Sequence, residues 1–419
     1  MLASLIHSPF SKGSQMTATL SSSAVFDARE AEANLYMRTF ARQPLTLVRG
    51  EGVRVWDDTG REYLDFLAGV AVNALGHCAP VIVEAVTRQA STLIHTSNIY
   101  RTVPQLQLAK LLIDNSCMDR IFYANSGAEA NECAIKLARK WGKLNRNGAF
   151  EVITALGSFH GRTLATLAAT GNRHYQEAFD PMPEGFRHVP FNDLEAMTSA
   201  IGPNTAAIML EPVLGEGGIY PATQEYLHGV RKLCDDHGIL LILDEVQSGI
   251  GRTGHLWGYE AYGIEPDVMT LAKGLGGGLP IGACLSKEHA SVFTPGDHGS
   301  TYSGSPLVCA ASLAVVSYIL ENDVLAHVRS MTAHLVAGLE AIKSEGDSGI
   351  SEIRASGLWM GIEFGEERAA AILDACREDG LLVNRTSTRT IRIAPPLIVS
   401  QDECDRFLDI FGRACVSAH

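Results

Sequence analysis

Two charged residues each follow an apolar run that reads as a buried strand. Asp244 comes directly after Ile239–Leu243, and Lys273 comes two residues after Val268–Leu271. A buried carboxylate is unfavourable unless it is paired, so Asp244 calls for a cationic partner. Partial desolvation lowers the pKa of a lysine and makes its amine nucleophilic. Lys273 is therefore a candidate for covalent chemistry with a carbonyl group, and the alternative is a surface lysine before the flexible run GLGGGLP, residues 274–280.

A third candidate site is a predicted helix start in RIFYANSGAEANECAIKLARKW, residues 120–141. Ser126 is a favourable N-cap and Glu129 would complete a capping box with it. Gly127 leaves the first N–H groups of the helix open, and such groups attract phosphate. By itself the segment is equally consistent with an ordinary capped helix.

Taken together, a phosphate-binding helix start, a strand-end acid and a strand-end lysine fit one cofactor. Pyridoxal 5′-phosphate needs a phosphate site, a lysine for its aldehyde and an anion opposite its ring nitrogen. Asp244 would keep that nitrogen protonated, and the ring would give the buried acid its cationic partner.

The elements that must position these residues alternate between short β-rich runs and longer helical patterns. This alternation predicts an α/β fold with a mainly parallel seven-stranded sheet covered by helices. Ligands in such sheets bind at the carboxyl ends of the strands, where Glu211, Asp244 and Lys273 fall. The predicted strands are Ile121–Ala124, Val152–Ala155, His188–Pro190, Ala207–Glu211, Ile239–Leu243, Val268–Leu271 and Ala283–Leu285.

The flanking sequence predicts a smaller α+β domain. Residues 44–73 read as a small β unit with a turn at 57–60, residues 305–345 as helical, and residues 350–419 as mixed strands and helices. We expect a flexible extension at 1–26, the two parts of the small domain at 27–75 and 311–419, and the large domain at 76–310. Residues 1–26 contain Ser and Thr but no acid or Arg, which favours a disordered tail over a transit peptide, and Met16 is an alternative start.

Composition excludes several other classes of function. With 34 basic and 47 acidic residues, the 419-residue chain has a net charge of −13, which argues against nucleic-acid or anionic-membrane partners. No apolar run approaches the roughly 18 residues of a membrane span. The nine cysteines form no C-x-x-C pair, so we expect no disulfide framework or metal site, and a cytoplasmic location fits best.

One motif indicates a different enzyme. GIGRTG, residues 249–254, matches the G-x-G-x-x-G pattern of nicotinamide-dependent dehydrogenases. That pattern needs its first glycine at a strand-to-helix turn, whereas here Asp244 and Glu245 precede it and would repel a pyrophosphate. We therefore regard a dehydrogenase as a remote alternative.

Several linked motifs resemble those of the class III pyridoxal-phosphate aminotransferases of fold type I. The resemblance covers about residues 36–415. It rests on NSGAEANECAIKLAR (125–139), FHGRTLATLAATG (159–171), EPVLGEGG (211–218), LDEVQSGIGRTG (243–254), LAKGLGGGLPIGA (271–283), HGSTYSGSPL (298–307) and IRIAPPLIV (391–399).

The resemblance implies a set of cofactor contacts and a homodimer. Lys273 would form the Schiff base and carry the proton, Asp244 would pair with the ring nitrogen, and Thr301 would reach the phosphate in the neighbouring subunit. The implied catalytic residues are Lys273 and Asp244, and the implied cofactor-binding residues are Ser126, Gly127, Ala128, Phe159, Asp244, Glu245, Val246, Gln247, Lys273 and Thr301. Ala128 departs from the family's usual hydroxyl residue, so one phosphate hydrogen bond is expected to be missing.

The resemblance also implies the substrates. Arg162 would bind the α-carboxylate, with Ser300 nearby. Glu216 and Arg392 would pair to accept the neutral arm of N2-acetyl-L-ornithine, and Arg392 would take the distal carboxylate of 2-oxoglutarate when Glu216 swings away. Arg385 and Arg389 could compete for the role of Arg392.

Other terminal-amine donors remain open: 4-aminobutyrate, succinylornithine, acetyl-lysine and ornithine. Phe40 stands where ornithine-specific relatives have Tyr, which disfavours free ornithine. A catalytically inactive scaffold is disfavoured because Lys273, Asp244, Arg162 and Arg392 are all present.

Overall fold

The computed structural model describes residues 27–417, so the predictions for residues 1–26 lie outside the described chain. Residues 27–46 form a compact unit by themselves. In it, Asp27 caps helix α1 (Ala28–Leu35) by accepting hydrogen bonds from the backbone N–H groups of Arg29 and Glu30. The ring of Phe40, which is 74% exposed, lies under the guanidinium of Arg42.

The rest of the described chain is built around a seven-stranded sheet, which confirms the predicted α/β fold. The sheet order is β4-β12-β11-β10-β7-β5-β6. β12 runs antiparallel to both neighbours, and the other neighbouring pairs are parallel. The strands are β4 (Arg120–Ala124), β5 (Glu151–Ala155), β6 (Phe186–Val189), β7 (Thr205–Leu210), β10 (Leu240–Asp244), β11 (Val268–Leu271) and β12 (Gly282–Ser286).

All seven predicted strands are present, with shifts of one or two residues at their ends. The largest shifts, of two residues, are at the starts of β6, predicted at His188 but found at Phe186, and of β7, predicted at Ala207 but found at Thr205. Glu211 lies one residue beyond β7, whereas Asp244 is the last residue of β10. Strand ends are set by hydrogen bonds to neighbouring strands, and a hydrophobic run does not reveal those bonds.

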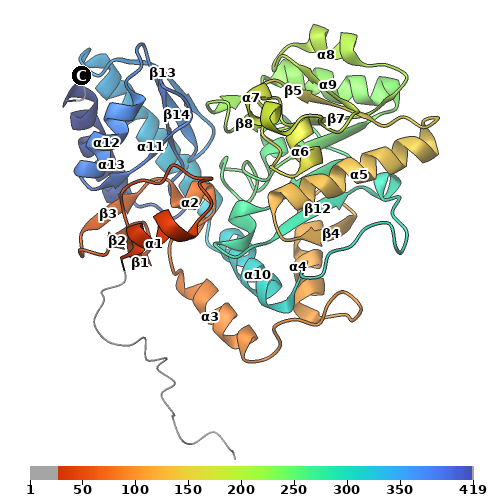
Figure 1. Cartoon of the computed structure of the whole chain (residues 1–419), viewed down its shortest axis with the longest axis horizontal. Coiled ribbons are helices and arrows are strands. Elements are labelled where there is room, and N and C mark those ends of the chain that lie inside the picture. The colour runs from red at the N-terminus through yellow and green to blue at the C-terminus, as the bar shows by residue number, and fades with distance from the viewer. Residues whose placement is uncertain (1–26, 418–419) are drawn as a thin grey trace, which may run out of the picture. The chain divides into compact units, whose positions relative to one another are not determined.

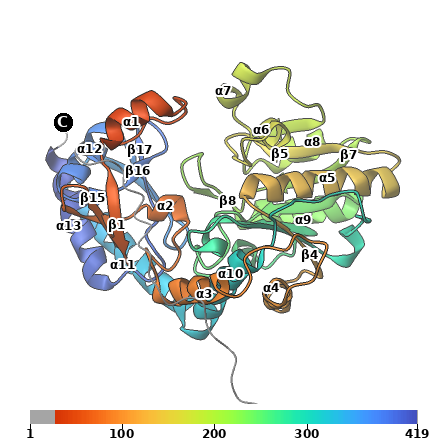
Figure 2. The same cartoon turned by 60° about the horizontal axis from the view of Figure 1, so that its bottom comes forward.

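Helices cover both faces of the sheet because its central strands are apolar on both sides. Leu240 and Ile242 of β10 pack in one cluster with residues of α5 (Gly127–Asn145), and Leu241 and Leu243 pack in another with residues of α9 (Gln224–His237). Both helices are visible in Figures 1 and 2. Strand alternation thus directs the side chain of Asp244 toward the face covered by α5.

Segments from both ends of the chain form the smaller sheets. One has the order β1-β2-β3-β15 and includes a parallel pairing of β3 with β15, and the other has the order β13-β14-β17-β16. Phe66, just after β3, stacks on Phe407 of α13 (Gln401–Ser417) with 4.5 Å between ring centroids. The strands are β1 (Leu47–Glu51), β2 (Arg54–Asp57), β3 (Glu62–Asp65), β13 (Ile350–Ala355), β14 (Met360–Phe364), β15 (Leu381–Leu382), β16 (Asn384–Arg385) and β17 (Thr390–Ile393).

These pairings agree with a small domain assembled from both ends of the chain, whose boundaries stay a prediction. The turn expected at 57–60 closes with a hydrogen bond from Gly60 N–H to the carbonyl of Asp57. A short hairpin, β8 (Val213–Leu214) and β9 (Tyr220–Pro221), carries residues 215–219 between its strands. The main remaining helices are α3 (Pro80–Ala90), α4 (Val103–Asp114), α6 (Leu164–Ala169), α7 (Arg173–Gln176), α8 (Leu194–Ala200), α10 (Pro306–Glu321), α11 (Val324–Ser344), α12 (Ala369–Glu378) and α13 (Gln401–Ser417).

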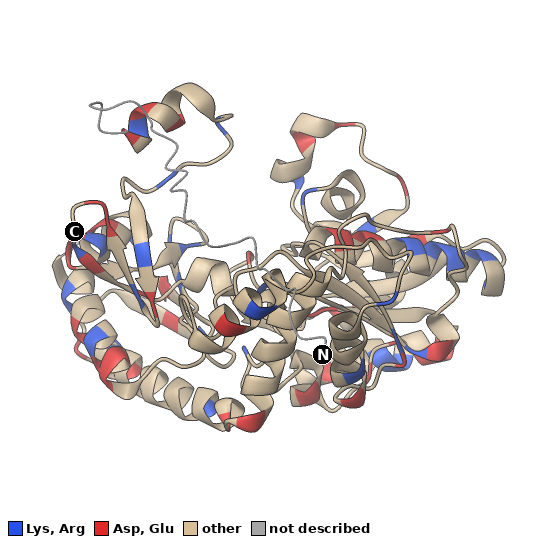
Figure 3. Cartoon of the chain, turned by 90° about the horizontal axis from the view of Figure 1, so that it is seen from below, with Lys and Arg blue, Asp and Glu red and all other residues tan. Residues whose placement is uncertain are grey.

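Charged residues of both signs are mixed along the outer helices, while the central strands carry few (Figure 3). Of the described helices, none is by itself long and apolar enough to cross a membrane. α10 and α11 meet that test of length and composition only as a pair, bent by 70°.

Candidate active site

A cavity of about 450 Å³ lies where the parallel strands end and α5 begins. Most of the residues predicted to bind cofactor or substrate line it. They are Ser126, Gly127, Ala128, Phe159, Arg162, Glu216, Asp244, Val246, Gln247 and Lys273. Residues that the sequence did not assign a role also line it, among them Val72, Asn125, Asn131, His160, Glu211, Leu279, Pro280 and Ile281.

The start of α5 forms the predicted anion site, with one difference in its cap. The Ser126 hydroxyl accepts a hydrogen bond from Glu129 N–H at 3.2 Å, as expected. The Glu129 carboxylate accepts from Asn125 N–H at 2.5 Å, so the reciprocal bond reaches one residue before the cap. A Cβ at Gly127 would lie 2.8 Å from Val246 Cγ1, so glycine is needed for this close approach. The first N–H groups of the helix have no carbonyl one turn back and are available to an anion.

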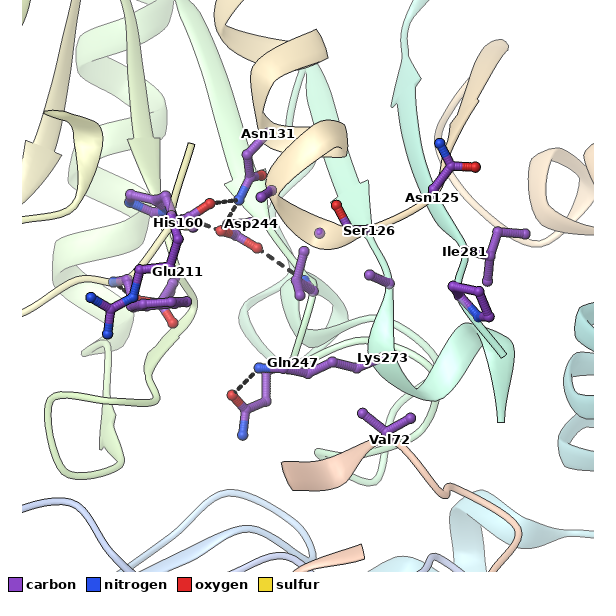
Figure 4. Close-up of a pocket in the computed structure, with 18 of the residues that line it drawn as sticks. Val72, Asn125, Ser126, Asn131, His160, Glu211, Asp244, Gln247, Lys273 and Ile281 are labelled. Carbon is purple, nitrogen blue, oxygen red and sulfur yellow. Dashed lines mark hydrogen bonds and ion pairs between the residues drawn. The ribbon is translucent and has the colours of Figure 1, made fainter. Parts of the chain in front are cut away.

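Asp244 is held by a buried network that orients its carboxylate (Figure 4). It is 4% exposed, and its Oδ2 accepts hydrogen bonds from Asn131 Nδ2 at 2.7 Å and His160 Nδ1 at 2.8 Å. Its Oδ1 accepts from Val246 N–H at 3.0 Å. These contacts fix the direction of the acid while its charge remains available to a cation in the cavity.

Asn131 and His160 were not predicted as part of the site. Asn131 lies on α5, and its Nδ2 also donates to the carbonyl of His160 at 2.8 Å. His160 falls inside the FHGRT motif, between Phe159 and Arg162, and that motif does not indicate its contact with Asp244. The sequence offered one signal for Asn131. Strand alternation directs the side chain of Asp244 toward α5, and Asn131 is a polar residue on the buried face of that helix.

Lys273 has the desolvated amine that the sequence predicts. Burial, together with the nearby charge of Arg392, lowers the pKa of Lys273 to about 8. The Nζ of Lys273 donates a hydrogen bond to Gln247 Oε1. Its backbone φ is +40°, a region that side-chain-bearing residues rarely adopt and that often marks functional positions.

The lowered pKa predicts how the apoprotein takes up an aldehyde cofactor. Only the neutral amine attacks an aldehyde, and with a pKa near 8 its fraction rises about tenfold per pH unit below that value. The rate of pyridoxal phosphate uptake, followed by visible absorption, should therefore rise up to about pH 8 and then level off. A rate that keeps rising to pH 10 would contradict the lowered pKa.

Glu245 lies outside the cavity, which does not support its prediction as a cofactor-binding residue. Its carboxylate accepts hydrogen bonds from the Ser248 hydroxyl and from the N–H groups of Gly258 and Tyr259, each at 2.7 Å. Burial raises the pKa of Glu245 to about 7. The residue thus holds the chain that follows β10, while the adjacent Asp244 lines the cavity.

Glu211 has a supporting role that the sequence did not reveal. It accepts hydrogen bonds from Phe159 N–H at 2.9 Å and Gly215 N–H at 3.3 Å. Burial raises the pKa of this carboxyl to about 7. Glu211 therefore ties the segment of Phe159 and Arg162 to the hairpin that carries Glu216.

Arg162 lies at the exposed rim of the cavity, held by aromatic rings. Its guanidinium carbon is 3.9 Å from the ring centroid of Tyr175 and 5.4 Å from that of Phe159. Stacking leaves the edge of the guanidinium free for a carboxylate. Tyr175 was not predicted from the sequence.

Glu216 and Arg392 form the predicted ion pair, with 2.6 Å between Oε1 and Nη1. Burial acts to raise the pKa of Glu216, but the charge and hydrogen bond of Arg392, together with the charges of Lys273 and Arg162, bring that pKa below the ordinary value. Arg392 is 2% exposed, whereas Arg385 and Arg389 are exposed on the surface. This placement favours Arg392 over both alternatives.

Ser300 and Thr301 do not line the cavity but a separate surface groove. The Ser300 hydroxyl accepts a hydrogen bond from Asn125 Nδ2 at 2.9 Å, which links the groove to the start of α5. Any role of Thr301 at a cofactor phosphate would have to be exercised in another subunit.

The cavity fits pyridoxal phosphate and does not fit a dinucleotide. The start of α5 suits the phosphate, Asp244 the ring nitrogen and Lys273 the aldehyde, with Phe159 and Val246 available to the ring. None of residues 249–254 lines the cavity, so GIGRTG is not placed to hold a pyrophosphate.

Comparisons with known proteins agree with this fit. Residues 36–415 match the family described as Aminotransferase class-III. An acetylornithine aminotransferase from Caldanaerobacter subterraneus subsp. tengcongensis is 51% identical over 380 residues, covering 90% of this chain and 96% of that protein.

Solved structures confirm the fold type. An ornithine aminotransferase from Toxoplasma gondii superimposes with a TM-score of 0.89 at 30% identity, over 93% of this chain and 94% of that one. An N-acetylornithine aminotransferase from Stenotrophomonas maltophilia gives a TM-score of 0.78 at 37% identity, over 89% and 96% of the two chains. The chain therefore belongs to the class III aminotransferases, which are pyridoxal-phosphate-dependent enzymes of fold type I.

Proposed function

We propose that the protein transfers the terminal amino group of N2-acetyl-L-ornithine to 2-oxoglutarate, the reaction of an acetylornithine aminotransferase, in arginine biosynthesis. The observation that carries the proposal is the Glu216–Arg392 pair beside Lys273. Paired, the two charges cancel and suit a donor with a neutral arm. Separated, Arg392 offers a guanidinium to an acceptor that carries an extra carboxylate. The names of the relatives support the same reaction.

The described residues would divide the chemistry among them. When bound, pyridoxal phosphate supplies an aldehyde that links to amines and a ring that accepts electrons. Lys273, with its lowered pKa, would remove and return the proton at the reacting carbon of the substrate. Asp244, held by Asn131 and His160, would keep a positive charge opposite it.

The two arginines would bind different carboxylates. Arg392 is buried and does not itself line the cavity, but it pairs with Glu216, which lines the cavity together with Lys273, so we place it behind Glu216 at the reacting end. Arg162 lies at the exposed rim. We therefore assign Arg392 the carboxylate next to the keto group of 2-oxoglutarate, and Arg162 the distal one. This reverses the expectation that Arg392 takes the distal carboxylate.

The same arrangement accounts for the donor. The carboxylate of N2-acetylornithine lies at the end of the molecule opposite its terminal amine, so Arg162 would bind it while the amine reaches Lys273. Glu216 is placed to move, since it lies between β8 and β9 and its side chain is 32% exposed. Its departure would free Arg392 for the acceptor.

This assignment predicts that the two arginines affect the half-reactions differently. Arg392→Met should lower kcat/KM for 2-oxoglutarate about 10- to 150-fold, the value of a hydrogen bond to a charged group. It should leave the acetylornithine half-reaction within about fivefold. Arg162→Met should impair both halves. Single-turnover absorbance measurements of each half give these values, and equal damage to both halves in Arg392→Met would contradict the switch.

A donor panel tests the proposed function itself. We expect kcat/KM to be highest for N2-acetylornithine among that compound, ornithine, 4-aminobutyrate, succinylornithine and acetyl-lysine. The acyl donors differ by one or two groups, so margins over them of only about 10-fold are expected. A clear preference for 4-aminobutyrate or free ornithine would replace the proposed substrate.

A homodimer is proposed as the active form. The groove lined by Ser300 and Thr301 borders an apolar surface around the start of α4, where Ile99 is 83% exposed and Tyr302 is 68% exposed. Large exposed apolar groups gathered in one region are typical of an interface. A second copy bound there would bring Thr301 toward another subunit, as the family resemblance implies.

Substitution on this surface should separate the subunits. Ile99→Asp combined with Tyr302→Asp is expected to give monomers in sedimentation velocity and to lower kcat by at least about tenfold. Leu144→Asp, on the 63% exposed Leu144 of α5, is the matched control and should remain dimeric. A fully active monomer would contradict the proposed interface.

A cytoplasmic location is part of the same proposal. All nine cysteines are free thiols, and seven are buried, which fits a reducing compartment.

A further inference from the structure

The GIGRTG loop, residues 249–254, does not line the cavity and contacts the C-terminal part of the chain. Gly251 has φ +87°, and a Cβ there would lie 3.1 Å from Leu397 Cδ1. Gly254 has φ +84°, and a Cβ there would lie 2.7 Å from the side chain of Arg329. The glycines therefore permit a close approach between this loop and elements that follow residue 320.

Arg252 is the central residue of this contact. It is 3% exposed, and its Nη1 donates hydrogen bonds to the carbonyls of Leu358 at 2.7 Å and Pro395 at 2.6 Å. Its own carbonyl accepts a hydrogen bond from Leu358 N–H at 3.1 Å. Within residues 27–417, no carboxylate pairs with it, and burial lowers its pKa to about 9. A buried guanidinium bound only to carbonyls is unfavourable, so its presence calls for a reason other than stability.

The two carbonyls belong to one end of a strand pair. β14 and β17 are antiparallel, with Met360 opposite Ile393 and Gly361 opposite Arg392. Leu358 lies two residues before β14, and Pro395 lies two residues after β17. The guanidinium thus bridges the open end of this pair, close to the position of Arg392.

The GIGRTG loop and the segment before β14 are packed closely, so neither backbone can shift without a clash. Gly357 has φ +63°, and a Cβ there would lie 2.2 Å from the carbonyl oxygen of Arg252. On the other side, the loop follows directly from the segment that carries Asp244 and Gln247. Arg252 therefore connects the cofactor-facing segment after β10 to the strand that carries Arg392.

We propose that Arg252 is a positioning residue for Arg392, holding the β14–β17 end so that Arg392 meets Glu216 and then the acceptor's carboxylate. The inference rests on the proposed function, which assigns that carboxylate to Arg392. Arg252 does not line the cavity, so it would act through Arg392. Its effect should appear in acceptor binding and should be small in the donor half-reaction, because the donor's carboxylate is assigned to Arg162.

The experiment compares Arg252→Met and Arg252→Lys in the full-length holoenzyme. Arg252→Met should raise KM for 2-oxoglutarate, and the Kd of the unreactive dicarboxylate glutarate, by about tenfold. The acetylornithine half-reaction should change less than about twofold. Lys can still donate to both carbonyls, so Arg252→Lys should restore acceptor binding to within about threefold of the original protein.

Arg329→Met is the matched control. Arg329 of α11 donates to the carbonyl of Gly254 in the same loop, and this bond involves neither Leu358 nor Pro395. It should leave acceptor binding unchanged, and an equal rise in both variants would show a general loosening of the loop and overturn the inference.

Arg392→Met distinguishes a failure of the positioning role of Arg252 from a failure of the proposed function. If Arg392→Met weakens glutarate binding and Arg252→Met does not, the positioning role is wrong while the proposed function stands. If Arg392→Met has no effect, the assignment of the acceptor carboxylate fails, and the positioning role fails with it. Should Arg252→Met not fold, Arg252→Gln takes its place, and unchanged glutarate binding in that variant overturns the inference.

Discussion

Replacing Lys273 by Ala is expected to lower kcat at least about 10³-fold. The amine is the group that joins the cofactor's aldehyde and that would carry the proton at the reacting carbon, and a positioned proton carrier alone contributes about 10²- to 10⁴-fold. Ala keeps the backbone position, including the φ of +40°, while removing the amine. The start of α5 and Asp244 remain in place, so the variant should still bind pyridoxal phosphate without a covalent link.

The covalent link gives a measurement that does not depend on turnover. Borohydride treatment of the original protein, followed by peptide mass analysis, should find the cofactor's mass fixed on Lys273 and should find none in the variant. Lys287 is a suitable control, because it also follows a strand of the main sheet but pairs with Glu265 away from the cavity. Lys287→Ala should keep both label and activity, and a label on any residue other than Lys273 would refute the assignment.

The main sheet could be predicted from sequence because its strands are short, apolar and separated by helical patterns. β10, LLILD, is buried at every position, and the apolar run before Asp244 shows this directly. The strand-end positions of Asp244 and Lys273 follow from the same pattern, since parallel strands bring their carboxyl ends to one edge. These local signals were sufficient to find two residues that line the cavity and to predict the desolvated lysine.

The contacts that orient the site could not be predicted in the same way, because their partners are far apart in sequence. Asn131 and Asp244 are 113 residues apart, and His160 and Asp244 are 84 apart. Glu245 shows the converse error: it adjoins a cofactor residue in the sequence but turns away to bind Ser248, Gly258 and Tyr259. Adjacency and motif membership do not reveal which way a side chain points after a strand ends.

Asp244→Asn is the second substitution with a large expected effect. Asn has nearly the same shape but carries no charge, so a cation opposite it loses its partner. With its oxygen toward Asn131 Nδ2 and His160 Nδ1, its NH₂ group would face the Val246 N–H, so two donors would meet where Oδ1 now accepts a hydrogen bond. Breaking a buried charge pair costs about 3–5 kcal/mol, which corresponds to roughly 10²- to 10³-fold in affinity or more.

The loss should appear in two measurements: the Kd for pyridoxal phosphate in absorbance titrations of the apoprotein, and kcat at saturating cofactor. Glu245→Gln is a close control, since it neutralises the adjacent buried acid, which does not line the cavity. It should reduce the free energy of unfolding, because the carboxylate accepts three hydrogen bonds, while leaving the cofactor Kd within about threefold. If Asp244→Asn binds cofactor as tightly as the original protein, or if both variants lose it equally, the charge of Asp244 has no specific role. A loss confined to Asp244→Asn would show that the two adjacent acids at the end of β10 have separate functions, one toward the cofactor and one toward the fold.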